Sequence, residues 1–232
     1  MPKRTVNQWH YIVESIHDYN VLLDTREIFI HGCLDEIDDS GVDHIMANKF
    51  VKNMRLLETL PAADKPIIIH QHSVGGDWSS GMMMFDTIVS CRCPILFIYH
   101  GEACSMGSII PQACAVHKNA YRVIMPNVLF MVHDGTTGID TNFTRKKTKS
   151  WAAIEEKLDK QMMEIYCRAC ANGEFFKNFE GNVKIKQYIR EQLDKSEDWW
   201  LNARETVFYG FADAVMGDEG YESIDDILQN WE

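Results

Sequence analysis

Ser105 lies in the segment YHGEACSMGSIIPQ (99–112), directly after an apolar run and at the start of residues with helical character. A serine in this position often caps a helix, because its hydroxyl accepts a hydrogen bond from an amide of the first turn. It is also well placed to act as a nucleophile, since backbone amides and the helix dipole at such a junction stabilise a developing oxyanion. On this segment alone, capping is the favoured interpretation.

A serine nucleophile requires a base and an acid that orients the base, and both residue types occur at the ends of other elements. His133 ends the apolar run VLFMVH, and Asp198 precedes a segment with a helix-capping pattern that begins at Asn202. Each has a common structural explanation: His133 as a partly buried histidine with its hydrogen bonds satisfied, and Asp198 as one of 34 acidic residues.

Gly75 and Gly76 follow another apolar run, in the segment HSVGGDWSSG. Paired glycines after a strand allow the backbone to approach another group closely, and their amides can face a developing negative charge. A plain tight turn is the simpler interpretation, because Gly-Gly alone is a weak signal. The pair gains weight only in combination with Ser105.

The elements that must position these residues alternate between strands and helices. Short β-branched or apolar runs predict strands, whereas Ile45, Met46, Phe50, Val51, Met54 and Leu57 recur at helical spacing. The expected strands cover 26–32, 65–73, 94–100, 121–126 and 128–133, and the expected helices cover 45–57, 81–90 and a segment from 105 that Pro111 should shorten. This alternation predicts an α/β fold with a parallel sheet and crossover helices.

The C-terminal third has a different pattern. Residues 151, 154, 158, 162, 165 and 169 are apolar at helical spacing up to Gly173, which predicts one long amphipathic helix. Its apolar stripe needs a partner, either the body of the same domain or a neighbouring subunit. We expect turns over 173–182, a helix over 183–194, and a helix capped by Asn202 and Glu205 that ends at Gly210.

The composition excludes several classes of protein. The chain has 232 residues, 46% of them hydrophobic and 25% charged, with a formal net charge of −11. The acidic charge argues against nucleic-acid binding. No apolar run approaches the roughly 18 residues that span a bilayer, and the start MPKRTVNQWH lacks the apolar part of a signal peptide. We therefore expect a cytoplasmic protein with no membrane or nucleic-acid partner.

The cysteines argue for a reducing compartment. There are seven, an odd number, and several lie in apolar segments. Cys91 with Cys93, and Cys167 with Cys170, are weak metal signals without a matching histidine spacing. Buried thiols are the preferred interpretation, and no metal or cofactor is expected.

Four motifs in the same order resemble the ClpP family of serine peptidases. HSVGGDWSSGMMMFDTI resembles the family's NSPGG…GMAIYDT, and GEACSMGS resembles GQAASMGA at an identical distance. MPNVLFMVH is similar to LPNSRVMIH, and EDWWLNARETVFYGFAD is similar to RDRFLSAPEAVEYGLVD. The preceding segment SIHDYNVLLDTREIFIHG also resembles the family's RSYDIYSRLLKDRIIFLG. The resemblance covers about residues 26–215.

The resemblance implies a ClpP/crotonase-like α/β fold of stacked β-α units with a long protruding handle helix over about 143–172. It also implies an N-terminal axial segment over 1–25 and a peptidase domain over 26–232. Residue by residue, Ser105 matches the nucleophile, His133 the general base and Asp198 the orienting acid. The oxyanion and substrate-binding positions correspond to Gly75, Gly76 and Met106, with backbone amides of the last two as donors.

By the same resemblance, we expect a serine endopeptidase that cuts unfolded proteins inside a homo-oligomeric chamber of two stacked heptameric rings. An AAA+ unfoldase of the ClpX or ClpA type is the implied partner. Two alternatives stay open: an inactive ring or scaffold subunit, and a crotonase-type acyl-CoA enzyme, against which the three matching catalytic positions count. Val74, Asp77 and Asp134 depart from the family pattern, and GGDW and HDG resemble divergent bacteriophage members.

Overall fold

A computed structural model describes residues 5–30, 41–61, 64–135, 144–179 and 181–231. Several expectations fall partly outside these ranges, including residues 1–4 of the axial segment 1–25, residue 180 of the expected turns 173–182, and parts of the peptidase domain 26–232. The last two residues of the expected strand 26–32, the first residue of the handle helix 143–172, and Cys33 also lie outside them.

A mixed sheet of eight strands forms the centre of the described part of the chain, in the order β1-β2-β3-β4-β5-β8, with β6 and β7 continuing from β4. Neighbouring strands from β2 to β5, and the pairs β4–β6 and β5–β8, are parallel, whereas β1–β2 and β6–β7 are antiparallel. The strands are β1 Val21–Leu22, β2 Glu27–Ile30, β3 Ile67–Ser73, β4 Ile95–Cys104, β5 Ala120–Ile124, β6 Leu129–His133, β7 Asp198–Leu201 and β8 Ala214–Val215.

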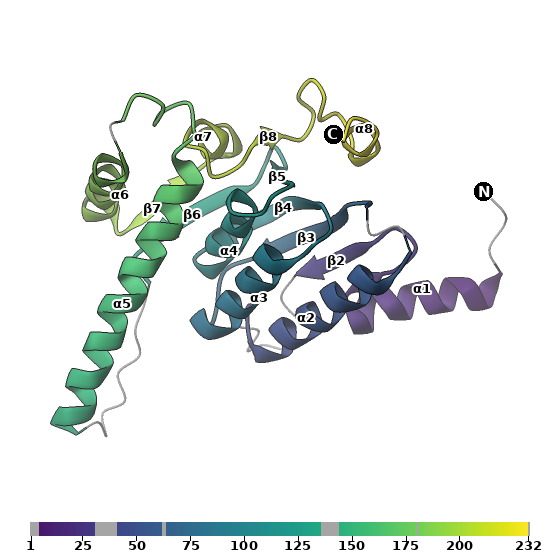
Figure 1. The fold of residues 1–232 in the computed structure, drawn as a ribbon, viewed down its shortest axis with the longest axis horizontal. Coiled ribbons are helices and arrows are strands. Elements are labelled where there is room, and N and C mark those ends of the chain that lie inside the picture. Colours follow the sequence, from purple (N-terminus) through teal and green to yellow (C-terminus); the bar gives the residue numbers. More distant parts are fainter. Residues whose placement is uncertain (1–4, 31–40, 62–63, 136–143, 180, 232) are drawn as a thin grey trace.

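Helices cover both faces of this sheet unequally. On one face α2, α3 and α4 pack side by side (Figure 1), and they enclose most of the hydrophobic core. On the other face α8 closes a smaller cluster that includes Ile98 and Ile227. The helices are α1 Val6–Tyr19, α2 His44–Thr59, α3 Trp78–Ser90, α4 Met106–Ile109, a 3₁₀ helix Ile110–Ala115, α5 Arg145–Cys170, α6 Asn182–Ser196, α7 Ala203–Phe208 and α8 Ile224–Gln229.

The expected alternation of strands and helices is confirmed, including the effect of Pro111. The helix that begins after Ser105 lasts only four residues before it tightens into the 3₁₀ helix that contains Pro111. A proline lacks the amide that a longer α-helix needs, so the chain cannot continue the regular pattern there. The capping box of Asn202 and Glu205 also forms as expected.

Strand β4 changes partner halfway along its length. Residues 95–99 pair with β5, whereas residues 102–104 pair with β6. Gly101 lies between the two halves with a φ of 55°, a left-handed conformation that glycine adopts without strain. The change of partner carries the end of β4 away from β5 and places it beside the end of β6.

A buried polar network holds the β5–β8 edge. The Arg122 guanidinium contacts the Asp213 carboxylate at 2.6 Å and donates to Gln112 Oε1 at 2.6 Å. The Tyr99 hydroxyl donates to the Phe211 carbonyl at 2.8 Å. Because Arg122 is 5% exposed, its charge depends on Asp213 for compensation.

The handle helix α5 packs on its own domain only in its second half. Met162 and Cys170 are buried, whereas Trp151 and Ile154 are 40% and 41% exposed. Figure 1 shows the N-terminal half of α5 projecting well beyond the sheet. The domain body therefore covers one half of the apolar stripe and leaves the other half open.

The N-terminal segment contains α1, which the sequence pattern did not predict. The side chains of Val6, Trp9 and Val13 on this helix are more than half exposed. In Figure 1, α1 extends from the opposite side of the molecule to α5. The helix therefore presents apolar side chains that are largely exposed.

Candidate active site

Ser105 stands at the end of β4, in the N-cap position of α4, but its hydroxyl makes no capping hydrogen bond. Its backbone has a φ of 52° and a ψ of −124°, an uncommon conformation for a residue with a side chain. The Oγ atom instead lies 2.7 Å from His133 Nε2, within hydrogen-bonding distance. The capping interpretation of Ser105 is therefore wrong.

The pairing of β4 with β6 brings His133 to Ser105. Cys104 aligns with Met131 in this parallel pair, and the Ser105 amide donates to the Met131 carbonyl at 3.2 Å. Both strands run in the same direction, so Ser105 and His133 emerge at the same edge of the sheet. The His133 side chain is 16% exposed, which limits the access of water to the hydroxyl-imidazole contact.

Asp198 reaches His133 through strand β7, which the sequence pattern did not predict. In the antiparallel pair β6–β7, His133 and Asp198 are directly opposite each other. The distance from His133 Nδ1 to Asp198 Oδ1 is 3.9 Å, which is longer than a hydrogen bond but within the range of an ion pair. The Asp198 side chain is 45% exposed. The structure thus brings the three candidates together in the order Ser105, His133, Asp198.

Gly75 and Gly76 form the loop opposite Ser105. Their φ angles are 113° and 145°, which residues with side chains rarely adopt. A Cβ atom on Gly75 would lie 2.5 Å from Ser105 Cβ, so only glycine permits this approach. The loop is fixed by Val42, whose amide donates to Gly75 and whose carbonyl accepts from Asp77. The backbone amide of Gly76 takes no part in these two hydrogen bonds.

Asp77, which departs from the family pattern, has a structural task in the described chain. Its carboxylate accepts hydrogen bonds from the amide and the hydroxyl of Ser80, at 2.7 and 2.6 Å, and so caps α3. These bonds, the hydroxyl first, hold the pKa of Asp77 below its ordinary value despite partial burial. The charge of Asp77 is therefore engaged at the start of the helix.

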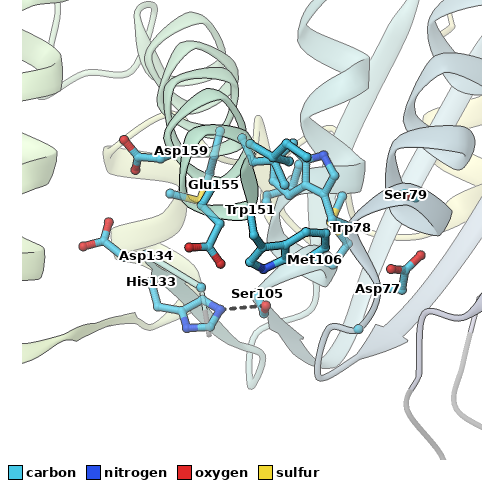
Figure 2. Close-up of a pocket in the computed structure, with 16 residues that line it drawn as sticks. Asp77, Trp78, Ser79, Ser105, Met106, His133, Asp134, Trp151, Glu155 and Asp159 are labelled. Carbon is cyan, nitrogen blue, oxygen red and sulfur yellow. Dashed lines mark hydrogen bonds between the residues drawn. The ribbon is translucent and has the colours of Figure 1, made fainter. Parts of the chain in front are cut away.

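A cavity of about 540 Å³ opens beside Ser105, between α3, α4, β6 and α5. Figure 2 shows the side chains of Trp78 and Trp151 inside it, above Ser105. Gly76 and Met106 line the same cavity, which places the two expected amide donors next to the serine. The other apolar side chains in its wall are Ile109, Ile154, Leu158 and Met162.

Acidic side chains also line this cavity, and they differ in their partners. Asp134 and Asp159 both form ion pairs with Arg190 of α6. Glu155 Oε1, in contrast, is buried with no hydrogen-bond partner among the described residues. In Figure 2 the Glu155 carboxylate points into the space above His133 and Ser105.

Sequence reasoning missed Glu155, Trp78 and Arg190. The spacing that predicted α5 includes Trp151, Ile154 and Leu158, and all three line the cavity. Glu155 follows Ile154 directly, so an acidic residue beside the cavity-facing stripe was an available signal. Arg190 had no comparable signal, because its role depends on how α6 packs beside α5.

Other groups near Ser105 do not form a second candidate catalytic or metal centre in the described part of the chain. Burial raises the pKa of the Cys104 thiol, next to Ser105, to about 11, so it is a poor nucleophile at neutral pH. The six cysteines described are free and buried. Within the same residues, no cluster of three or more histidine, cysteine or acidic side chains could hold a metal ion.

None of the described helices is long and apolar enough to cross a membrane.

Comparisons with known proteins identify relatives that match most of the chain. The ATP-dependent Clp protease proteolytic subunit of Streptococcus uberis is 28% identical over 200 residues, which cover 85% of this chain and 88% of that protein. The proteolytic subunit 2 of Pseudomonas aeruginosa is 29% identical over 199 residues, with coverage of 85% and 84%. The corresponding subunit 2 of Treponema denticola is 29% identical over 202 residues, with coverage of 83% and 82%.

The family model described as Clp protease matches residues 12–219, which is most of the chain. The matched region contains every element that forms the site around Ser105, from β2 to α7. The α/β architecture with a long projecting helix is the one that the sequence motifs implied. The chain belongs to the Clp protease family.

Proposed function

We propose that this chain is a serine endopeptidase subunit with Ser105 as the nucleophile, His133 as the general base and Asp198 as the orienting acid. The observation that carries the proposal is the 2.7 Å contact between Ser105 Oγ and His133 Nε2 at the meeting point of β4, α4 and β6. Membership of the Clp protease family and the names of the relatives support the same activity.

In the first step, Ser105 Oγ attacks the carbonyl carbon of a peptide bond while His133 Nε2 takes the hydroxyl proton. The peptide C–N bond then breaks, and the imidazolium gives its proton to the leaving amine. Water, activated by the same imidazole, attacks the acyl-serine ester and releases the carboxylic acid product. The proton returns to Ser105, so the site is unchanged after one turnover.

Two other groups stabilise this sequence in our proposal. The backbone amides of Gly76 and Met106 bind the oxyanion that forms on the attacked carbonyl, with Gly75 allowing the loop to approach. The Asp198 carboxylate holds the His133 proton on Nδ1 and stabilises the imidazolium. The separation of 3.9 Å shortens when substrate binds, because catalytic hydrogen bonds often tighten only in the complex.

The chain also has surfaces that fit assembly into rings. The N-terminal half of α5 and the outer face of α1 expose Trp151, Ile154 and Trp9, which are large apolar side chains. Exposed apolar surface of this kind is typical of protein-protein contacts. We propose a homo-oligomer of two stacked heptameric rings joined through α5, with residues 1–25 at the axial entrance. An AAA+ unfoldase of the ClpX or ClpA type would then supply unfolded protein.

The test combines mass by light scattering with cleavage of short fluorogenic peptides that need no unfoldase. We expect an assembled particle, measurable turnover, and loss of turnover to background in Ser105→Ala. Assembly and stability should stay unchanged in this variant, because Ser105 Oγ makes no capping bond. An assembled wild-type protein without turnover on any peptide would instead favour an inactive scaffold subunit, and wild-type turnover in Ser105→Ala would exclude the serine mechanism.

A further inference from the structure

The cavity beside Ser105 is lined by one acidic side chain that has a buried oxygen without a hydrogen-bond partner among the described residues. Glu155 Oε1 is buried and has no hydrogen-bond partner among the described residues. The carboxylate comes from α5 and points toward the space above Ser105 and His133 (Figure 2). A buried carboxylate oxygen without a partner is costly, and it indicates that a donor comes from outside the described part of the chain.

The other acids of the cavity already have partners within the chain. Arg190 pairs with both Asp134 and Asp159, and Asp77 caps α3 through Ser80. Among the acids that line the described cavity, Glu155 is the one with a buried oxygen that lacks a partner.

The walls around Glu155 suit a long side chain with a charged end. Trp78, Trp151, Ile154 and Leu158 line the cavity with aromatic and aliphatic surface. Lysine and arginine bury their methylene stems against such surface and place the charge at the tip. Their cationic groups also bind favourably over indole rings. The cavity thus combines an apolar wall for the stem with an acceptor for the cation.

We propose that Glu155 makes this peptidase prefer substrates with lysine or arginine as the residue that supplies the attacked carbonyl, the P1 residue. The proposal rests on the function of Ser105 proposed above. Ser105 and Glu155 line one cavity, so the P1 side chain of an acyl group on Ser105 enters the space that the Glu155 carboxylate faces. An apolar P1 side chain would leave the buried carboxylate oxygen unpaired, which disfavours such substrates.

The test uses N-acetylated fluorogenic peptides that differ only at P1, with lysine, acetyl-lysine or leucine. Acetyl-lysine retains the stem and removes the charge, and the N-acetyl group excludes recognition of a free terminal amine. We expect kcat/KM for lysine to exceed that for acetyl-lysine by roughly 10- to 100-fold, the range for a hydrogen bond to a charged group. Glu155→Gln should remove most of this difference by slowing the lysine substrate.

Glu156→Gln is the matched control, because Glu156 is the next residue on α5, is exposed, and pairs with Lys160 on the helix surface. It should keep the wild-type preference. Equal rates for lysine and acetyl-lysine in an enzyme that cleaves either substrate would overturn the Glu155 proposal and leave the peptidase function intact. Equal slowing of every substrate by Glu155→Gln would also overturn it, since that result would mean that Glu155 acts on His133 and not on the P1 side chain. Absence of cleavage of all three peptides would contradict the proposed function itself.

Discussion

His133 and Asp198 occupy directly opposite positions of the antiparallel pair β6–β7, and 3.9 Å separates Nδ1 of the histidine from Oδ1 of the aspartate. The backbone pairing, more than the side chains, fixes this relationship. Glu197 and Asp194 lie nearby in sequence but outside β7, since Glu197 ends α6 and Asp194 lies within it. Asp198 is thus the acid that the sheet places opposite the imidazole.

Asp198→Asn should lower kcat on short peptides by about 10³- to 10⁴-fold with little change in KM, because the amide no longer holds the histidine tautomer or stabilises its cation. Steady-state kinetics on a peptide that needs no unfoldase provides the measurement. Glu197→Gln and Asp194→Asn are the controls and should retain near-normal turnover. If either control loses turnover while Asp198→Asn remains active, the assignment of Asp198 as the orienting acid is wrong.

Gly75→Ala should abolish turnover while the assembled protein persists. The added methyl would lie 2.5 Å from Ser105 Cβ, so the loop or the serine must move away from its present position. Gly217→Ala is the matched control, because Gly217 also has a positive φ of 99° but its Cβ would meet no atom within 4 Å. Peptide cleavage and light scattering on both variants check the prediction. Turnover in Gly75→Ala equal to that of the control would show that the close approach has no catalytic importance.

Asp213→Ala should destabilise the fold by about 3–5 kcal/mol, because it leaves the buried Arg122 guanidinium without its carboxylate. The control is Asp218→Ala, which removes the partner of the exposed Arg204 and should cost no more than about 1 kcal/mol. Chemical denaturation of the two variants measures the difference. Equal losses for the buried and the exposed pair would contradict the role assigned to the Arg122 network.

A group of histidines on β3 and β4 should make stability depend on pH. His100 contacts His70 at 3.0 Å, His70 contacts Glu27 at 3.1 Å, and His72 and Glu102 lie on the same strands. Burial, followed by the charges of His70 and His72, lowers the pKa of His100 to about 4. An unfolded histidine takes up its proton near pH 6.5, so the unfolded state binds more protons between about pH 6.5 and 4.

The free energy of unfolding should therefore fall as the pH drops through this interval. Glu27 contributes in the same direction at lower pH, because the hydrogen bond from His70 holds its pKa below the ordinary value. Thermal unfolding measured from pH 7 to pH 4 checks this expectation. The acid-induced loss should shrink in His100→Gln and stay unchanged in His10→Gln, which alters an exposed histidine of α1. An identical pH profile in His100→Gln would contradict the assignment.

The sequence was sufficient to predict the elements whose patterns are local. The β-branched runs of β3 and β4, the helical spacing of α2 and the capping box at Asn202 depend on neighbours in the chain, and all appear in the structure. The same holds for the interruption at Pro111, whose missing amide acts within its own helix.

Features that depend on long-range packing escaped prediction. Strand β7 has four residues, two of them tryptophan, and it exists because β6 offers a free edge. The position of Glu155 depends on how α5 is rotated relative to Ser105, which the spacing of its apolar residues does not specify. In the same way, the ion pairs of Arg190 require α6, α5 and the end of β6 to meet.

The most direct test of the central claim is the reaction of the native assembled protein with a fluorophosphonate probe, followed by intact-mass measurement and peptide mapping. The probe loses fluoride as an activated serine oxygen bonds to its phosphorus. We expect one adduct per chain, on Ser105, absent in Ser105→Ala and retained in Ser79→Ala, which alters another serine of the same cavity. No adduct on the wild-type protein, or an adduct that persists in Ser105→Ala, would contradict the assignment of Ser105 as the nucleophile.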